Sequence, residues 1–439
     1  MRRGNNHPQE SHGIISTRYG WVITIMLTLL FMVNWADKAV LGLAAEPIIK
    51  EFHLTNTDFG LLSGIFFLLF GLTGILAGAI STRVPTTRIM TVLAILWAIS
   101  MIPVLILPTL AMLYVSRIIL GAAEGPTSPL IVHAVHKWFP EDRRAIPTGL
   151  SQAGGALGVL ISGPILTWVI YQYGWRYAFA ILAIVAVVWV VVWLFLGKEG
   201  PLTTYAAARS GDADQLDIAD PEVSYWRLLL SPTWIGCALV GIGGYWALVA
   251  GVVWMPRLLE GALHYSHSTV GLLVAVPPVL SVFSLLFFPW ISERAINAGA
   301  NRRLMSGVLT GAILIVCGVA AALVPVVKSP IAVLLMCVAF GLPSGIYPLI
   351  FLMVAHISPV RRRGPALTTA TALVTTVGGL ASPILLGVIM DRAGGVMQGF
   401  SHVFAYTSII MIIGGLIGIA MVRPGADARR FGLVQNGNH

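Results

Sequence analysis

Four charged side chains lie inside long apolar stretches, where a charge is expensive. Asp37 and Lys38 are neighbours in the stretch 21–45, and Arg117 and Glu124 lie seven residues apart in the stretch 110–136. A charge at the centre of a bilayer costs at least about 2.5 kcal/mol, so such residues face the protein interior and mark functional sites. Seven residues are nearly two helical turns, which puts Arg117 and Glu124 on one helix face. We expect the four side chains to line one cavity.

Two interpretations of these charges stay open at this point. In the first, they form structural ion pairs, Asp37 with Lys38 or Arg117 and Glu124 with Arg117, that only neutralise one another. In the second, they bind and release protons: the set is neutral when both carboxylates are ionised and carries two positive charges when both are protonated. A protonated cavity would attract an anion.

Uncharged polar side chains at membrane depth are candidates for binding a substrate. The first half supplies Asn34, Trp35 and Gln152, and the second half supplies Tyr245, Ser344, Tyr347, Thr371 and Thr375. The alternative for each hydroxyl is a hydrogen bond to the backbone of its own helix. Helix breaks at Gly125-Pro126, Pro343 and Gly345 are tolerated at membrane depth only where polar partners or a cavity satisfy the backbone. We expect these breaks to flank the same cavity.

The elements that position these residues are membrane-spanning helices. Apolar residues make up 57% of the 439 residues and charged residues 10%, against about 25% charged in soluble domains. At about 20 apolar residues per span, the sequence predicts twelve spans: 21–45, 57–80, 89–107, 110–136, 146–171, 177–196, 231–259, 269–290, 304–326, 330–356, 365–390 and 402–422.

These spans predict an all-α membrane protein with two pseudo-symmetric six-helix bundles. The predicted parts are a tail at 1–18, a bundle at 19–197, a linker at 198–230, a second bundle at 231–422 and a tail at 423–439. Several acidic residues in the linker, from Asp212 to Glu222, indicate a solvated segment.

Basic residues are distributed unevenly between the loops of the two membrane faces. Of the 27 lysines and arginines, Lys38 and Arg117 lie within spans, and five lie on one set of alternate loops: Lys50, Arg176, Arg257, Lys328 and Arg392. The remaining twenty lie on the other set, with the two termini. Positive charge favours the cytoplasmic face. We therefore predict an inner-membrane protein with both termini in the cytoplasm, whose net charge of +9 reflects topology and no nucleic-acid partner.

Motifs for catalysis or cofactor binding are missing from the sequence. Gly197-Lys198 precedes Glu199 and lacks the upstream glycine of a phosphate-binding loop. His133 and His136 have no acidic partner nearby in sequence, and Cys237, Cys317 and Cys337 lie in apolar runs without metal-ligand spacing. We predict a monomer that is no enzyme and binds neither a metal nor a cofactor.

The sequence resembles the major facilitator superfamily, and more closely its anion:cation symporter family of sugar-acid carriers and sialin-like transporters. The resemblance covers nearly all twelve spans. It rests on Asn34-Trp-Ala-Asp37-Lys38, the segment from Arg117 to Pro126, Gly174-Trp175-Arg176 and Trp254-Met-Pro256. It implies that Asp37 and Glu124 are protonation sites, that Arg117 couples them, and that Lys38 holds the substrate carboxylate.

Three segments depart from the family pattern. Lys38 replaces the usual arginine and offers a point charge instead of a bidentate fork. Thr375 and Thr376 stand where sugar-acid carriers have asparagines in span eleven, which makes a less hydroxylated carboxylate as suitable as a hexonate. The first loop has Thr82 and Pro85 where the superfamily has Asp and Gly.

The expected function is proton-coupled import of a small organic anion by alternating access, with protons, the anion and the lipid bilayer as partners. An exchanger or a facilitator that uses the same charges for binding alone is the alternative. A channel is disfavoured by the paired halves, and an enzyme by the missing catalytic constellation.

Overall fold

Helices form every membrane span of the chain. The computed structural model describes residues 10–81, 83–107, 109–140, 143–201, 223–328 and 330–433. Within them, 12 helical segments are long and apolar enough to cross a membrane, which confirms the predicted all-α fold. The predictions about Thr82, the acidic segment of the linker and the extreme ends of both tails lie outside the described residues.

The first six spans precede the linker. They are α1 (Glu10–Leu43), α3 (Asn56–Gly64) continued by α4 (Phe66–Ile80), α5 (Thr86–Ile106), α6 (Leu110–Glu124) continued by α7 (Thr127–His136), α8 (Ala145–Tyr173) and α9 (Trp175–Leu196). We call described residues up to 201 the first half.

The other six spans follow the linker. They are α12 (Pro232–Gly261), α13 (His267–Leu273) continued by α14 (Val276–Asn297), η3 (Arg303–Val308) continued by α15 (Leu309–Leu323), α16 (Ile331–Gly341) continued through η4 (Leu342–Gly345) by α17 (Ile346–His356), α18 (Val360–Arg392) and α19 (Val396–Met421). We call described residues from 223 the second half. Three short helices, α2 (Ala45–Phe52), α11 (Tyr225–Leu229) and α20 (Pro424–Arg430), lie between or after the spans.

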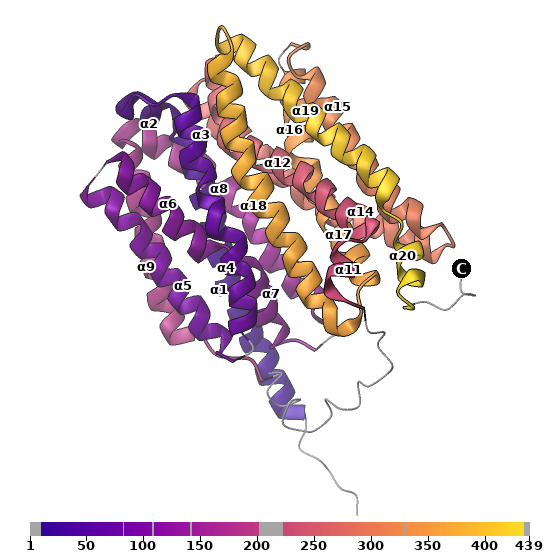
Figure 1. The fold of residues 1–439 in the computed structure, drawn as a ribbon. Helices are drawn as coiled ribbons and strands as arrows, with labels where there is room; N and C mark the ends of the chain where they lie inside the picture. The colour runs from indigo at the N-terminus through magenta and orange to yellow at the C-terminus, as the bar shows by residue number, and fades with distance from the viewer. Residues whose placement is uncertain are drawn as a thin grey trace, which may run out of the picture.

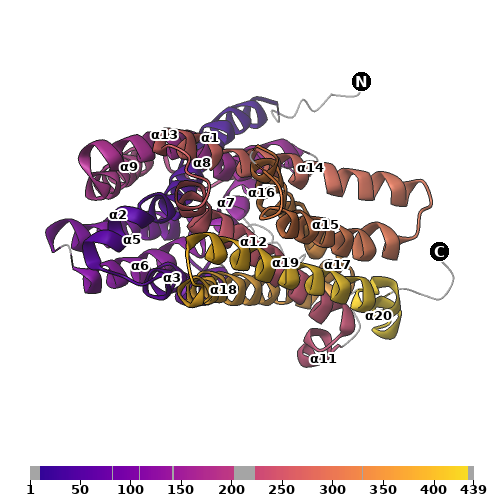
Figure 2. The same ribbon diagram turned by 90° about the horizontal axis from the view of Figure 1, so that it is seen from above.

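The two halves lie side by side. Figure 1 shows the indigo to magenta helices of the first half on one side and most of the helices of the second half on the other. Seen from above in Figure 2, α3 runs beside α18 and α8 beside α13. The halves also meet where α4 packs against α18, α1 against α12 and α8 against α14. We call the side where α1 begins and α19 ends the terminus side, and the other the opposite side.

Two spans break where the sequence places proline and glycine together. The fourth span changes from α6 to α7 at Gly125-Pro126, and the tenth passes through the 3-10 turn η4, which contains Pro343 and Gly345. Proline lacks the backbone N–H that a continuous helix requires, so these sites interrupt the helical hydrogen bonding. Both breaks lie at the predicted positions.

Polar contacts close the halves against each other on the opposite side. The carboxylate of Asp391, at the end of α18, accepts hydrogen bonds from the backbone amides of Asn56 (2.9 Å) and Thr57 (2.7 Å) at the start of α3. An acidic group is stabilised at a helix N-terminus. The hydroxyl of Tyr171, at the end of α8, donates to the Glu260 carboxylate of α12 at 2.9 to 3.0 Å. This side of the molecule is therefore shut.

Glycines let α3 and α18 approach closely within that closed side. A Cβ atom added at Gly60 or Gly64 would collide with the backbone oxygen of Pro383 or Leu380. Small residues allow two helix backbones to pack closely in a membrane. The contact therefore depends on glycine at these positions.

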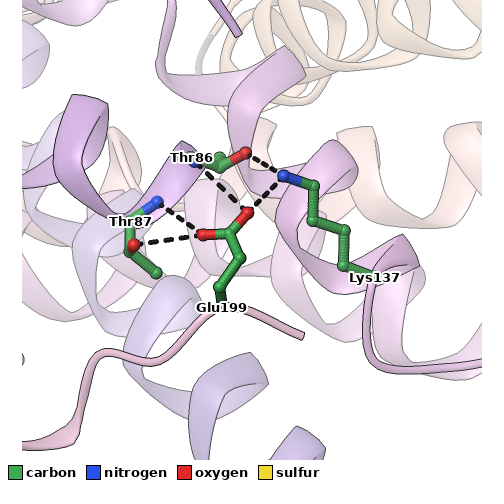
Figure 3. Close-up of polar contacts among 4 residues, drawn as sticks. All are labelled: Thr86, Thr87, Lys137 and Glu199. Atoms are coloured by element: carbon green, nitrogen blue, oxygen red, sulfur yellow. Dashed lines mark hydrogen bonds and ion pairs between the residues drawn. The ribbon is translucent and has the colours of Figure 1, made fainter. Parts of the chain in front are cut away.

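A partly buried carboxylate joins three helices on the terminus side of the first half. Figure 3 shows Glu199, just after α9, pointing at the N-terminus of α5, where it accepts hydrogen bonds from the backbone amides of Thr86 (3.3 Å) and Thr87 (3.2 Å). It also pairs with Lys137, which follows α7 and donates a 2.7 Å bond to the Thr86 hydroxyl. Glu199 therefore caps a helix and neutralises a buried lysine at once.

Replacing Glu199 with glutamine is expected to lower stability in a pH-dependent way. Burial alone would raise the pKa of the Glu199 carboxyl, but hydrogen bonds from Lys137 and Thr87 and the charge of Lys137 lower this pKa below its ordinary value. The carboxylate thus contributes stability above its unfolded pKa of about 4.3, and this contribution is lost as pH falls through the lower folded pKa. Loss of the charged hydrogen bonds costs about 1–3 kcal/mol.

The measurement is thermal unfolding of the purified protein in detergent between pH 3 and 8. The midpoint of the Glu199→Gln variant should lie below that of the unmodified protein at pH 7, and the two should converge below about pH 4. Glu293→Gln, which alters an exposed carboxylate, serves as the control. A difference that stays constant with pH would contradict the assigned charge.

Candidate functional site

The four intramembrane charges meet between α1 and α6. Asp37, Arg117 and Glu124 are 1–2% exposed, and the Lys38 side chain is 9% exposed. The structure therefore brings together all four residues that the sequence singles out. Since burial removes water from each charge, their contacts decide which groups remain available to a ligand.

Lys38 and Glu124 form the ion pair of the site. The Lys38 ammonium also donates to the Asn34 side-chain oxygen at 2.6 Å and to the Asn34 backbone oxygen at 3.3 Å. Residues four apart share a helix face, which explains why Asn34 reaches Lys38. The other oxygen of Glu124, Oε1, has no hydrogen-bond partner. The lysine is thus engaged by protein groups, whereas the glutamate keeps one oxygen available.

Arg117 is the cation that keeps free donors. Its Nη1 donates to the backbone oxygen of Asp37 at 3.3 Å, and its guanidinium lies over the Phe179 ring at 5.2 Å. Its Nε and Nη2 atoms are buried without a hydrogen-bond partner. These two nitrogens form one edge of the guanidinium, the fork that binds a carboxylate with two parallel hydrogen bonds.

Asp37 lies beside these cations without an ion pair to either in the described part of the chain. Its Oδ1 is buried without a hydrogen-bond partner, and it interacts electrostatically with Glu124, Arg117 and Lys38. Successive residues point about 100° apart around a helix, so Asp37 and Lys38 project from α1 in different directions. The described part of the structure therefore contains none of the three pairings considered from the sequence and pairs Glu124 with Lys38 instead.

A cavity adjoins Lys38 and Arg117 at the boundary between the halves. Its walls come from α1, α3, α4, α6 and α12 and consist of Trp35, Lys38, Leu41, Ser63, Phe66, Phe67, Arg117, Tyr245, Leu248, Val249, Val252 and Val253. The Lys38 ammonium lies 5.4–5.7 Å from the ring centres of Trp35, Phe66 and Phe70. One end of the cavity is cationic, and the rest is aromatic and aliphatic.

Of the other candidate residues of the first half, Trp35 and Asn34 lie at or beside this end, and Gln152 contacts α7. Trp35 lines the cavity, and Asn34 holds Lys38 while its own amide nitrogen has no partner. Gln152 accepts a 3.1 Å bond from Ser128 and also keeps an unpartnered amide nitrogen. These amides offer donors but do not themselves line the cavity.

The candidates of the second half divide into two groups. Tyr245 lines the cavity, and the Tyr347 hydroxyl is buried without a partner. Ser344 donates to the Ser281 hydroxyl at 3.0 Å. Thr371 and Thr375 donate to backbone oxygens one turn back in α18, each at 2.9 Å. The structure thus places only Tyr245 of these five on the cavity wall.

Sequence reasoning missed the aromatic wall from α4 and the aliphatic wall from α12. Phe66 and Phe67 belong to the run Phe-Phe-Leu-Leu-Phe, and Leu248 to Val253 belong to a similar apolar run. Apolar runs of this kind are typical of lipid-facing helix surfaces, so nothing distinguished these residues. A signal was present in Gly379 and Gly42, whose missing side chains make room for the Phe67 ring and the Val252 backbone.

The fold and this site define a class of protein. Two six-helix halves with buried, ionisable groups between them are the arrangement of a transporter that binds its substrate at the boundary of its halves. Residues 27–383 match the family model of the Major Facilitator Superfamily. The chain belongs to this superfamily and is a multi-pass membrane transporter of the secondary type, not an enzyme.

Several curated relatives cover nearly the whole chain. The chain is 25% identical to a probable sulfoacetate transporter of Cupriavidus necator, with 92% of each chain covered. It is 24% identical to the hexuronate transporter of Bacillus subtilis, covering 92% of this chain and 94% of the relative. It is 23% identical to the D-galactonate transporter of Escherichia coli, covering 94% and 97%.

Solved structures share the fold. A bacterial homologue of the human lysosomal transporter Spinster superposes with a TM-score of 0.74 at 16% identity, covering 93% of this chain and 98% of that chain. A D-xylose-proton symporter superposes with a TM-score of 0.73 at 18% identity, covering 93% and 99%. At this identity the similarity establishes the fold and nothing about substrates.

Proposed function

We propose that the chain imports a small organic anion together with protons, by alternating access of the site between the halves. The observation that carries the proposal is the pairing of Lys38 with Glu124 beside the free fork of Arg117. Relatives named as transporters of sulfoacetate, hexuronate and D-galactonate support an anionic substrate.

The ion pair supplies a physical link between proton and anion. While Glu124 is ionised, it occupies the Lys38 ammonium and competes with a substrate carboxylate for it. Protonation removes that competitor and leaves two cations, Lys38 and Arg117, facing the cavity. Protonation of Asp37 adds a further positive charge to the set. Since opposite charges attract strongly in a site without water, a protonated site binds an anion far better than an ionised one.

The proposed orientation in the membrane determines which contacts lie at the outer face and which at the cytoplasmic face. The basic loops and both termini lie in the cytoplasm of a cell whose inner membrane the protein spans. The closed contacts of Asp391 and of Tyr171 with Glu260 then lie at the outer face. In the import cycle, these contacts open to admit protons and the anion and close again before release inside. The transport unit in this proposal is one chain, since a single chain encloses the site.

The test is uptake by proteoliposomes that contain the purified full-length chain. Radiolabelled sulfoacetate, D-galactonate, D-glucuronate and benzenesulfonate, an aromatic anion that stays ionised at this pH, are added outside at acidic pH, and uptake by empty liposomes is subtracted. Symport predicts accumulation above the equilibrium level that disappears when a protonophore collapses the pH gradient. Counterflow that ignores the pH gradient would identify an exchanger or facilitator and contradict proton coupling. Absence of protein-dependent uptake for every anion would refute the proposed function.

A further inference from the structure

The cavity walls distant from the charges are apolar. The second half contributes Tyr245, Leu248, Val249, Val252 and Val253 from α12, and the first half contributes the rings of Phe66 and Phe67. The Phe67 and Tyr245 rings meet edge to face with their centres 5.7 Å apart. Edge-to-face contact is the favoured geometry between aromatic rings, and a ligand ring can join it.

Most hydroxyl groups that could recognise a polyhydroxylated acid are hydrogen-bonded within the protein, and the unpartnered Tyr347 hydroxyl is absent from the described cavity wall. Thr371 and Thr375 bond to their own helix, Ser344 bonds to Ser281, and Ser63, on the cavity wall, donates to the backbone oxygen of Phe59 at 2.9 Å. A binding site without water must supply a hydrogen-bond partner for each hydroxyl of its ligand, because burying a hydroxyl without a partner is costly. The described wall residues contain three uncharged polar side chains: the Trp35 indole, the Tyr245 hydroxyl and the Ser63 hydroxyl, which is already hydrogen-bonded.

The charged end supplies a place for one carboxylate. Arg117 lines the cavity, and its Nε and Nη2 atoms are buried and unpartnered. They can donate two parallel hydrogen bonds to one carboxylate. A second carboxylate carried on the part of the ligand that packs against Leu248, Val249 and Val252 would be desolvated there without a partner.

We propose that the substrate is a monocarboxylate with an apolar, aromatic body, whose carboxylate binds the Arg117 fork and whose ring packs against Phe67, Tyr245 and Leu248. This inference rests on the proposed function of anion transport and deepens it. It also separates this chain from its named relatives, whose substrates are sulfoacetate and sugar acids.

The first test compares three ligands on the purified full-length protein. Binding is measured in detergent by thermal shift and calorimetry, because a lipophilic acid crosses bilayers in its neutral form without a carrier. Benzoate is the probe, D-galactonate is the hydroxylated acid, and benzyl alcohol is the neutral analogue. We expect benzoate to bind at least about tenfold more tightly than D-galactonate and benzyl alcohol not to bind measurably.

The outcomes separate the two proposals. Tighter binding of D-galactonate than of benzoate would overturn the substrate class and leave anion transport standing. Stabilisation by benzyl alcohol equal to that by benzoate would also overturn it, because the Arg117 fork would then play no part. Failure of every anion in both the binding and the liposome assays would instead refute the proposed function.

The second test changes one wall residue. Leu248→Asn places an amide against the proposed ring position at nearly constant size, and it should weaken benzoate binding at least about tenfold, because the amide must lose its water or exclude the ring. Leu107→Asn changes an exposed leucine at the end of α5 and should leave benzoate binding within about twofold. Equal benzoate binding by the Leu248 variant and the unmodified protein would overturn the ring position.

Discussion

Replacement of Glu124 with glutamine is expected to abolish accumulation driven by a pH gradient while anion exchange persists. Glutamine resembles the protonated acid in shape and carries no charge, so Lys38 loses its ion-pair partner and stays available to the anion at every pH. Binding of the anion then no longer depends on a proton. Asp37→Asn should also weaken accumulation, because it removes one of the two carboxylates that are proposed to bind protons.

The measurement is proteoliposome uptake with and without an inward proton gradient, followed by counterflow with unlabelled anion inside. Glu293→Gln is the matched control, since it makes the same change at an exposed position. The coupling role would be refuted if Glu124→Gln and Asp37→Asn both accumulated substrate like the unmodified protein. If a variant lost both counterflow and accumulation, the substitution would have damaged the binding site instead. The midpoint of thermal unfolding would then show whether the variant is still folded.

The second large effect concerns the shape of the cation at position 117. Arg117→Lys keeps the positive charge but replaces the planar fork, whose Nε and Nη2 are unpartnered, with a single ammonium. Two parallel charge-assisted hydrogen bonds become one, and the contact with the Phe179 ring changes as well. We expect the binding free energy of the anion to fall by about 2 kcal/mol, or about 30-fold in Kd.

Calorimetry of the purified variant with its best anion checks this expectation. Arg294→Lys, a substitution at an exposed position of α14, should leave Kd unchanged. An unchanged Kd for Arg117→Lys would place the carboxylate on Lys38, the residue that the family resemblance favours. The Kd of the Arg117→Lys variant, compared with that of its control, therefore decides which cation holds the substrate.

The roles of the two cations follow from their partners and not from their charge. Lys38 is held by Asn34 and Glu124, so it responds to the protonation state of Glu124. Within the described residues, Arg117 donates one hydrogen bond, to the Asp37 backbone oxygen, and keeps Nε and Nη2 unpartnered, so it is ready to bind an anion before any proton arrives. This division suits a carrier in which Arg117 binds the substrate and the availability of Lys38 depends on the protonation of Glu124.

The sequence by itself determined the twelve spans, the positions of the helix breaks and the set of four buried charges. These features can be read from local sequence. A bilayer requires about 20 apolar residues per span, and a charge within a span is so costly that it marks a functional site. The prediction that Asp37, Lys38, Arg117 and Glu124 share one site needed only their depth along two antiparallel helices.

Only the tertiary structure decided how those charges pair and what surrounds them. Whether Glu124 reaches Lys38 or Arg117 depends on the rotation of α6 against α1, which packing sets and which residue spacing leaves open. The same holds for the cavity wall, since the runs around Phe67 and Leu248 have the composition of lipid-facing surfaces and become a binding wall only where the halves meet. Thr371 and Thr375 lie at a suitable depth, yet hydrogen bonds within α18 satisfy their hydroxyls, because a nearby backbone oxygen is always within reach of a threonine in a helix.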